Sequence, residues 1–349
     1  MNNNHLKQKA FPKVRFLRYL LPWIFLGIAA VILVMKISTI ENTVSVLKTM
    51  SVWIVGMAVL AQVFSYLSSG YLLRVIVNRS AFPLSVVRGT LITIAAESIG
   101  LAGGMASSAA ATYYWVSKDD DVSGEAALAG VLPILCNSVV LITITIIGMV
   151  YLLFNHELSR TQIFSYGLIL TVLVTGILVI FYGLKHREKM EKLISIIAKK
   201  LIYILKSDYD LNIIHNNIGH FYRGMKMLSN GGWIKIAVGP VMNTVFDMFT
   251  IYLFFIAAGY FIKPSVLIAG YSLAFLLGRG AFFIPGGSGV VEGGMVAIYT
   301  NLGVPSHINV VVVLGYRFLS FWLPSLLGFL AMIYLQRTLE VSNSKVTTQ

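Results

Sequence analysis

Charged side chains accompany a glycine-rich break in the second half of a strongly apolar chain. Arg279 precedes the break, Glu292 follows it, and Arg317 lies farther along the chain. Two guanidinium groups can hold a phosphate through paired hydrogen bonds, and a helix beginning near the break would aim its N-terminal N–H groups at the same ligand. A carboxylate could balance an arginine or bind an ammonium group. We therefore predict a binding site for a lipid phosphate or a zwitterionic head group. The break itself is formed by Pro285, Gly286, Gly287 and Gly289.

Two acidic residues in other apolar stretches are further candidates. A charge at membrane depth costs roughly 3 kcal/mol on insertion scales, so each one is a functional hypothesis. Glu97 precedes another glycine pair much as Arg279 precedes the break, and we include it among the predicted binding residues. Asp247 is more typical of helix packing or of a counter-ion. For Arg317 and Glu292, the alternative is an ion pair that only holds the fold together.

The sequence lacks the usual catalytic patterns. Its histidines do not have the spacing of a helical zinc site, Cys136 is the only cysteine, and no phosphate-binding loop or core acidic pair occurs. We therefore expect no catalytic residue, no metal and no cofactor, and we expect that the protein is not an enzyme. An ATP-driven pump would need a partner that supplies the nucleotide-binding domain.

The composition requires a membrane environment. Of the 349 residues, 57% are hydrophobic and 12% are charged, and the mean hydropathy is +0.80. Soluble domains carry roughly 25% charged residues, so a soluble globular protein, a disordered chain and a secreted disulfide scaffold are excluded. In such a chain, the net charge of +13 indicates lysines and arginines that face anionic lipid on the cytoplasmic side, not nucleic-acid binding.

Stretches without ionisable residues predict the elements that position these side chains. Two apolar regions, 84–116 and 265–302, are interrupted by glycines at Leu101–Met105 and Ile284–Gly289. Their halves are short for a full crossing, so we predict two re-entrant broken-helix pairs; the alternative is two ordinary helices with a glycine-rich bend. The fold class is therefore all-α, a polytopic membrane helix bundle. About six full transmembrane helices are predicted, at 19–35, 49–73, 126–155, 161–184, 233–259 and 306–336.

The order of these elements repeats along the chain. In each half a long helix, a proline, a broken segment and another long helix follow one another, which predicts an inverted repeat with a substrate site between the repeats. Placing the basic clusters in the cytoplasm puts both termini there and requires both broken segments to re-enter. No cleavable signal peptide is expected. The predicted regions are a basic N-terminus (1–18), a first membrane half (19–184), a basic amphipathic linker (185–230), a second membrane half (231–337) and a short tail (338–349).

The second half of the chain resembles the flippase-like membrane domain of the lysylphosphatidylglycerol synthase transmembrane family, which includes uncharacterised stand-alone members. The resemblance rests on the ordered motifs Gly278-Arg279, Ile284-Pro-Gly-Gly-Ser-Gly-Val-Val-Glu292, Leu302-Gly-Val-Pro305, Tyr316-Arg317 and Pro324. It implies a membrane domain with re-entrant helices that moves a lipid between leaflets, an aminoacylated phosphatidylglycerol in the member that gives the family its name. The first half departs from the family pattern, because Leu101–Ser108 lacks the usual Pro-Gly break and its neighbouring charges. The family's motif positions fall on Pro285, Gly286, Gly287, Gly289, Glu292 and Arg317.

We therefore expect a lipid translocator of the cell membrane that moves an anionic or aminoacylated phospholipid, or a polyprenyl lipid or glycolipid, between leaflets. Its expected partners are membrane lipid head groups and a lipid-synthesising enzyme, with no nucleic acid. One alternative is a non-catalytic accessory subunit of a cell-envelope lipid or glycolipid pathway. Another is an ion-coupled small-solute transporter that couples through Asp247 or Glu97. Because the chain ends soon after its last helix, we do not expect it to make an aminoacyl lipid itself.

Overall fold

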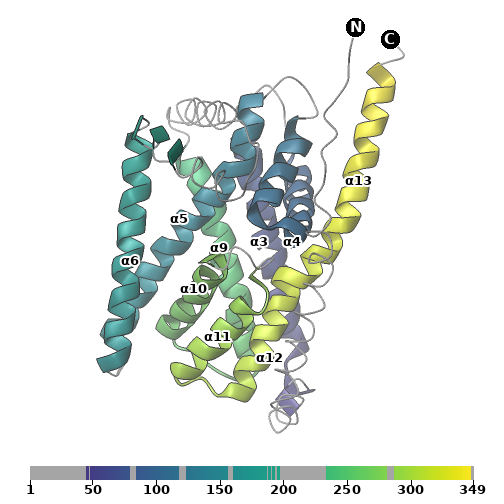
Figure 1. Ribbon diagram of the computed structural model, residues 1–349. Helices are drawn as coiled ribbons and strands as arrows, with labels where there is room; N and C mark the ends of the chain where they lie inside the picture. The colour runs from purple at the N-terminus through teal and green to yellow at the C-terminus, as the bar shows by residue number, and fades with distance from the viewer. Residues whose placement is uncertain are drawn as a thin grey trace, which may run out of the picture.

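The fold is a bundle of helices. A computed structural model describes residues 45, 46, 48–78, 84–117, 123–155, 160–186, 188, 189, 191, 192, 195, 196, 233–280 and 287–346. Within these residues every regular element is helical, which confirms the all-α class (Figure 1). The elements are α3 (Val52–Val77), α4 (Val86–Ser117), α5 (Ser123–Asn155), α6 (Arg160–Lys185), α9 (Trp233–Ala257), α10 (Pro264–Gly280), α11 (Val290–Asn301), α12 (Ser306–Arg317), the π-helical segment η2 (Phe318–Trp322) and α13 (Leu323–Val346).

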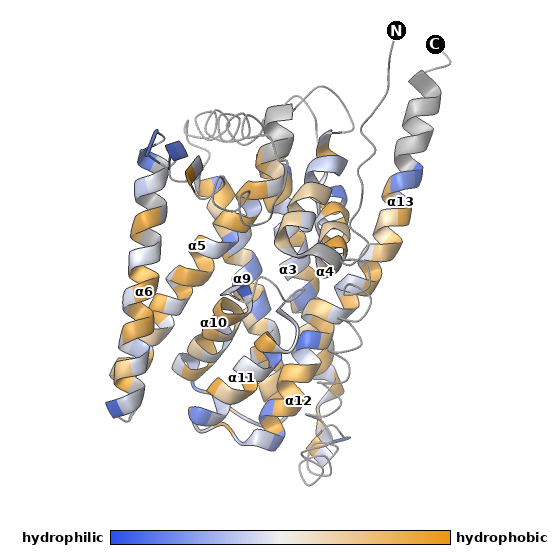
Figure 2. Cartoon of the chain, viewed as in Figure 1, coloured by the Kyte–Doolittle hydropathy of each residue, from blue (hydrophilic) through white to orange (hydrophobic). Residues whose placement is uncertain are grey.

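Long apolar helices confirm the membrane assignment. Four stretches are long and apolar enough to cross a bilayer, and they coincide with the predicted spans at 49–73, 126–155, 233–259 and 306–336. Helix α6 covers the predicted span at 161–184, whereas the span at 19–35 lies outside the described residues. Large apolar side chains are exposed on these helices, among them Phe164 and Leu168 on α6 and Leu330 on α13, and Figure 2 shows that α5 and α6 are apolar over most of their length. Such surfaces indicate contact with lipid, since soluble monomers rarely expose large apolar patches.

The second predicted broken segment is an antiparallel pair of short helices. A Cβ added to Gly270 on α10 would lie 2.1 Å from the Tyr299 ring on α11, and one added to Gly278 would lie 2.3 Å from Val291. Residues late in α10 therefore face residues early in α11. At 1.5 Å per residue, the 17 residues of α10 and the 12 residues of α11 span about 25 Å and 18 Å, less than a hydrocarbon core of about 30 Å. The predicted helix pair at 265–302 is thus confirmed.

The first broken segment, α4, also folds back on itself. Gly104 has a φ of 73° and a ψ of −165°, a conformation open to glycine and unfavourable for other residues. Beyond this turn, the Ser107 hydroxyl donates to the carbonyl of Ile99 at 3.3 Å, and Gly100 faces Ser108. The predicted pair at 84–116 is therefore present, with its turn inside the glycine-rich stretch that the sequence singled out.

The two helical pairs pack reciprocally against the two halves of the bundle. The pair formed by α10 and α11 contacts α5 of the first half, where Gly148 approaches Ile268. The pair formed by α4 contacts α13 of the second half, where Gly328 approaches Ser98. Figure 1 shows the two pairs in opposite halves of the bundle, with α3 and α9 side by side between them. This exchange is the arrangement expected of an inverted repeat; the boundaries of the membrane halves, the linker at 185–230 and the basic N-terminus stay predictions.

The contact between α4 and α13 should depend on the absence of a side chain at Gly328. A Cβ there would lie 1.9 Å from Ser98 Oγ and 2.5 Å from the carbonyl oxygen of Ile94. We expect Gly328→Ala to lower the free energy of unfolding by about 1–3 kcal/mol, because backbone must move to relieve such overpacking. Thermal unfolding of the purified protein in detergent measures this. Gly167→Ala on α6 is the control, since a Cβ there meets nothing within 4 Å; equal melting temperatures for the two variants would contradict the prediction.

Candidate anion-binding site

Glycines in left-handed conformations place Glu292 at the start of α11. Gly287 has a φ of 63° and Gly289 a φ of 81°, so the chain turns sharply into α11 where other residues would be strained. Glu292 lies in the first turn of this helix, and its Oε2 accepts a hydrogen bond of 2.7 Å from the backbone N–H of Gly289. The carboxylate therefore occupies the helix N-terminus, where the dipole favours a negative charge.

Arg317 meets this carboxylate from the end of α12. Its Nε donates to Glu292 Oε1 at 2.8 Å, and the residue is only 2% exposed. The guanidinium carbon lies 4.3 Å from the centre of the Phe321 ring and 5.8 Å from that of Phe275, distances at which the ring faces attract a cation. The ion pair that the sequence offered as a structural alternative is therefore present.

The pair does not satisfy the arginine completely. Arg317 Nη2 is buried and has no hydrogen-bond partner among the described residues, and the same holds for the hydroxyl of Ser320. An unpaired buried donor costs about 1–3 kcal/mol, and more when it is charged. Two buried donors that are close together in sequence are thus without a hydrogen-bond partner among the described residues.

A π-helical segment shapes this part of the site. Residues Phe318–Trp322 form η2 directly after Arg317, and Pro324 follows. A proline lacks the N–H of a regular helix and crowds the carbonyl four residues earlier, so the helix must widen or kink. The hydroxyl of Tyr66 on α3 donates to the carbonyl of Leu319 within the segment. Single π-helical turns are frequent at functional sites, and this one carries Phe321 beside the guanidinium.

The structure brings together four of the predicted binding residues: Gly287, Gly289, Glu292 and Arg317. Arg279 lies in the last turn of α10, but its Nη1 donates to Ser138 Oγ on α5 at 2.6 Å. We expected the three charges to converge, but the polar partner found for Arg279 in the described residues is Ser138, not the ion pair. The physical reason is that α10 packs against α5, whose serine is within reach. Pro285 and Gly286 lie outside the described residues.

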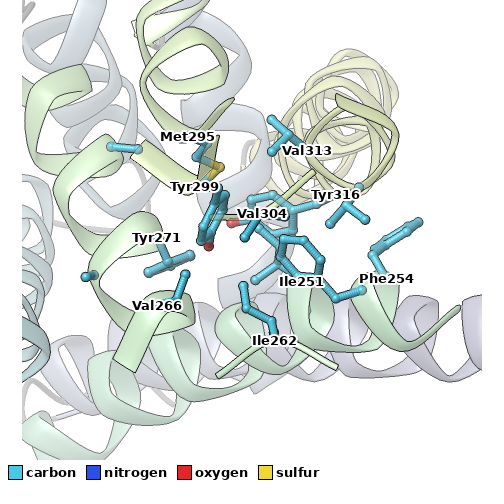
Figure 3. Close-up of a cluster of buried hydrophobic side chains, with 14 of the residues drawn as sticks. Ile251, Phe254, Ile262, Val266, Tyr271, Met295, Tyr299, Val304, Val313 and Tyr316 are labelled. Atoms are coloured by element: carbon cyan, nitrogen blue, oxygen red, sulfur yellow. The ribbon is translucent and has the colours of Figure 1, made fainter. Parts of the chain in front are cut away.

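Asp247 organises a neighbouring polar cluster whose other members the sequence did not indicate. Its Oδ2 accepts hydrogen bonds from the hydroxyls of Tyr271, at 2.7 Å, and Tyr316, at 2.6 Å, and its Oδ1 accepts one from Gln62 Nε2 at 3.0 Å. The tyrosine rings belong to the buried core between α9, α10 and α12 (Figure 3). Glu97, on α4, keeps an exposed side chain and interacts electrostatically with Asp247.

These partners escaped detection because each is one polar residue on a different apolar helix. No spacing within one segment marks Gln62, Tyr271 or Tyr316, so only their meeting in the fold identifies them. Asp247 alone carried a signal, as an ionisable residue in an apolar stretch. In the described residues, no three histidine, cysteine, aspartate or glutamate side chains lie together as metal ligands would.

The arrangement can exchange one anion for another. Glu292 holds both the N–H of Gly289 and the Nε of Arg317, which are donors that a phosphate oxygen could also use. Arg317 Nη2 has no partner in the described part of the chain. The protein's own carboxylate therefore holds two donors of the candidate site, and one charged donor has no partner among the described residues.

Comparisons with known proteins agree with the membrane assignment. The family described as the lysylphosphatidylglycerol synthase TM region has a model that matches residues 24–328. The chain is 26% identical over 170 residues to a UPF0104 membrane protein of Methanocaldococcus jannaschii, an alignment that covers 48% of this chain and 50% of that protein. It is 25% identical over 202 residues to a UPF0104 membrane protein of Methanothermobacter thermautotrophicus, covering 56% of this chain and 57% of the relative. The chain thus spans about half the length of the curated relatives it matches.

Proposed function

The chain belongs to the lysylphosphatidylglycerol synthase transmembrane-region family, and from this premise we propose that it is a lipid translocator. Its substrate is a lipid with an anionic or aminoacylated head group, a phospholipid or a polyprenyl or glycosyl lipid phosphate. The protein moves the head group between leaflets and performs no catalytic chemistry. It lies in the cell membrane with both termini on the cytoplasmic side, as the distribution of basic residues predicts.

One observation carries the proposal: the guanidinium of Arg317 is buried, paired on one side and unpaired on the other. Its Nη2 has no partner among the described residues, although a buried cationic donor is costly to leave unpaired. A phosphate oxygen at this position would supply the missing hydrogen bond. A second oxygen would compete with Glu292 for Nε, which gives the bidentate contact that arginine makes with phosphate.

Glu292 acts in this proposal as a placeholder for the lipid phosphate. Without lipid, its carboxylate neutralises Arg317 and caps α11 through Gly289. When a phosphate takes over Arg317, the released carboxylate is free to receive an ammonium group of an aminoacylated lipid. The site is thereby never left with an uncompensated charge, whose cost at membrane depth would oppose the movement.

The lipid tails need no protein path. The described helices expose large apolar side chains over much of the bundle, such as Phe164 on α6 and Phe329 on α13, so the tails can stay in the bilayer while the head group passes the site. The turn at Gly287 lies against Gly278 of α10, and irregular backbone at membrane depth is tolerated where protein surrounds it.

Lipid translocation in proteoliposomes tests the proposal. The purified protein is reconstituted with a fluorescent phosphatidylglycerol, lysyl-phosphatidylglycerol, phosphatidylcholine or undecaprenyl phosphate, and a membrane-impermeant quencher reports the outer leaflet over time. We expect protein-dependent movement of one anionic or aminoacylated class. Glu292→Gln should alter its rate, since the placeholder loses its charge, while Gly167→Ala should leave the rate unchanged. A well-folded protein that moves none of these lipids would contradict the proposal.

A second candidate function is favoured by the ion pair itself. An accessory subunit of a lipid-synthesising enzyme would use Glu292 and Arg317 only to hold α11 against α12. In that case, substitutions at either position would change stability and leave lipid movement unaffected. Capture of the native complex by crosslinking, followed by identification of an enzyme that uses a lipid substrate, would then support the accessory role.

A further inference from the structure

The Asp247 cluster lies beside the anion site, and the proposed function does not use it. We propose that Asp247 is a proton-binding site that holds α10 to α9 and α12 when it is ionised and loosens α10 when it is protonated. The effect of this proton on lipid movement rests on the proposed function, because α10 precedes the break that carries the proposed anion site. The protonation itself does not rest on that function and is tested separately.

Asp247 gathers hydrogen bonds from three other helices. Tyr271 of α10 and Tyr316 of α12 donate to Oδ2 at 2.7 and 2.6 Å, and Gln62 of α3 donates to Oδ1 at 3.0 Å. All three groups donate hydrogen bonds to Asp247, as expected around an ionised carboxylate. A metal cation at this position would instead be surrounded by acceptor atoms. Hydrogen bonds to a charged acceptor are roughly twice as strong as neutral ones. The ionised carboxylate therefore fastens α3, α10 and α12 to α9.

The amide of Gln62 supplies an independent sign of a second state. Gln62 is 3% exposed, and while its Nε2 donates to Asp247, its Oε1 is buried without a partner in the described part of the chain. A buried acceptor left unpaired is costly. Protonation turns Asp247 into a donor, and rotation of the Gln62 amide would direct Oε1 at that proton. One side chain thus provides a partner for each form of the carboxyl group.

Glu97 of α4 is the second carboxyl group in this region. Its side chain is exposed, it has no hydrogen bond or ion pair to another described residue, and it interacts electrostatically with Asp247. Repulsion between two carboxylates disfavours the state in which both are ionised.

The other charged and titratable groups around Asp247 do not replace this proton. Tyr66 of α3 interacts electrostatically with both carboxyl groups, and Tyr271 and Tyr316 donate to Asp247 as neutral hydroxyls. Arg317 of α12 interacts with Asp247 electrostatically, but its charge is already compensated by Glu292. Asp247 therefore has no cation of its own among the described residues, and a proton is the simplest charge to neutralise it.

Loosening of α10 would act directly on the anion site. Tyr271 packs against Phe275 at 4.8 Å between ring centres, and Phe275 lies against the guanidinium of Arg317. A change in the hydrogen bonds of Tyr271 is thus transmitted by two packed side chains to the arginine. The coupled element is the α10–α11 pair, which carries the glycine turn at Gly287.

Infrared difference spectroscopy tests the protonation on the purified protein in detergent. We expect the carbonyl stretch of a protonated carboxyl group to grow as the pH is lowered and one component to vanish in Asp247→Asn. Tyr271→Phe combined with Tyr316→Phe removes two donors to the ionised form and keeps both rings, so we expect its Asp247 to bind a proton at least tenfold more tightly. Glu188→Gln, an exposed residue after α6, should leave the titration unchanged. A titration that is identical in wild type and Asp247→Asn would overturn the proposal.

Hydrogen exchange followed by mass spectrometry tests the release of α10. We expect the protection of the wild-type α10 amides, corrected for the pH dependence of intrinsic exchange, to be at least fivefold lower at low pH than at high pH. The same peptides of Asp247→Asn should show low protection at both pH values. Equal pH responses of the two proteins would overturn the proposal. The proposal would also be overturned if replacing choline with sodium at constant pH changed the exchange of the α10 amides, because the bound cation would then be sodium and not a proton.

Lipid movement under an imposed pH gradient separates this inference from the proposed function. If wild-type protein moves lipid and the gradient changes the rate severalfold only when Asp247 is present, both stand. Lipid movement with no response to the gradient overturns the coupling and leaves the translocator intact. A normal Asp247 titration without movement of any lipid overturns the translocator and leaves the proton site supported.

Discussion

Arg317→Ala is expected to abolish lipid translocation and to lower the free energy of unfolding by about 3 kcal/mol. Breaking a buried ion pair by removing one partner costs roughly 3–5 kcal/mol, and the 16% exposure of the Glu292 side chain places the effect at the lower end. The expected loss of function has a separate cause, because the proposed lipid phosphate would lose its bidentate ligand. Chemical denaturation in detergent measures the first effect and the proteoliposome assay the second.

Two matched variants separate these effects. Arg317→Ala combined with Glu292→Gln removes both charges, so it should recover most of the stability without recovering translocation. Arg317→Lys keeps the charge but loses the planar fork, so it should retain partial stability and translocate much more slowly. Full translocation by a folded Arg317→Ala protein would contradict the role of the arginine and favour the accessory-subunit alternative.

Gly287→Ala is expected to destabilise the protein by about 2 kcal/mol and to slow translocation strongly. A φ of 63° costs a residue with a side chain about 1–2 kcal/mol, and the new Cβ would lie 3.1 Å from the Cα of Gly278 and 3.2 Å from its carbonyl oxygen. Both contacts are with backbone, so α10 and α11 must separate. The turn that positions Glu292 would then change shape.

Gly293→Ala provides the internal control on the same helix. Gly293 is exposed, its added Cβ meets nothing within 4 Å, and alanine favours a helix by up to about 1 kcal/mol over glycine. We expect this variant to be slightly more stable than wild type and to translocate normally. Similar melting temperatures for Gly287→Ala and Gly293→Ala would show that the conformation at Gly287 is not required.

The sequence alone determined the class of the protein and the main elements of its fold. Low charge and long apolar stretches required membrane helices because unpaired charges are costly in lipid, and four described spans confirm this. The glycine-rich breaks predicted two folded-back pairs, because glycine permits the left-handed turn found at Gly104 and at Gly287. These signals are local: hydropathy, helix length and backbone conformation depend on residues close together in the chain.

The tertiary structure alone decided which polar residues meet. The sequence grouped Arg279 with Arg317 and Glu292, yet Arg279 reaches Ser138 on α5, because packing of α10 against that helix fixes its direction. Gln62, Tyr271 and Tyr316 converge on Asp247 from three helices, and no spacing within any one segment encodes that convergence. Hydrogen-bond partners are set by how helices rotate and cross, which results from packing over the whole bundle rather than from any local pattern.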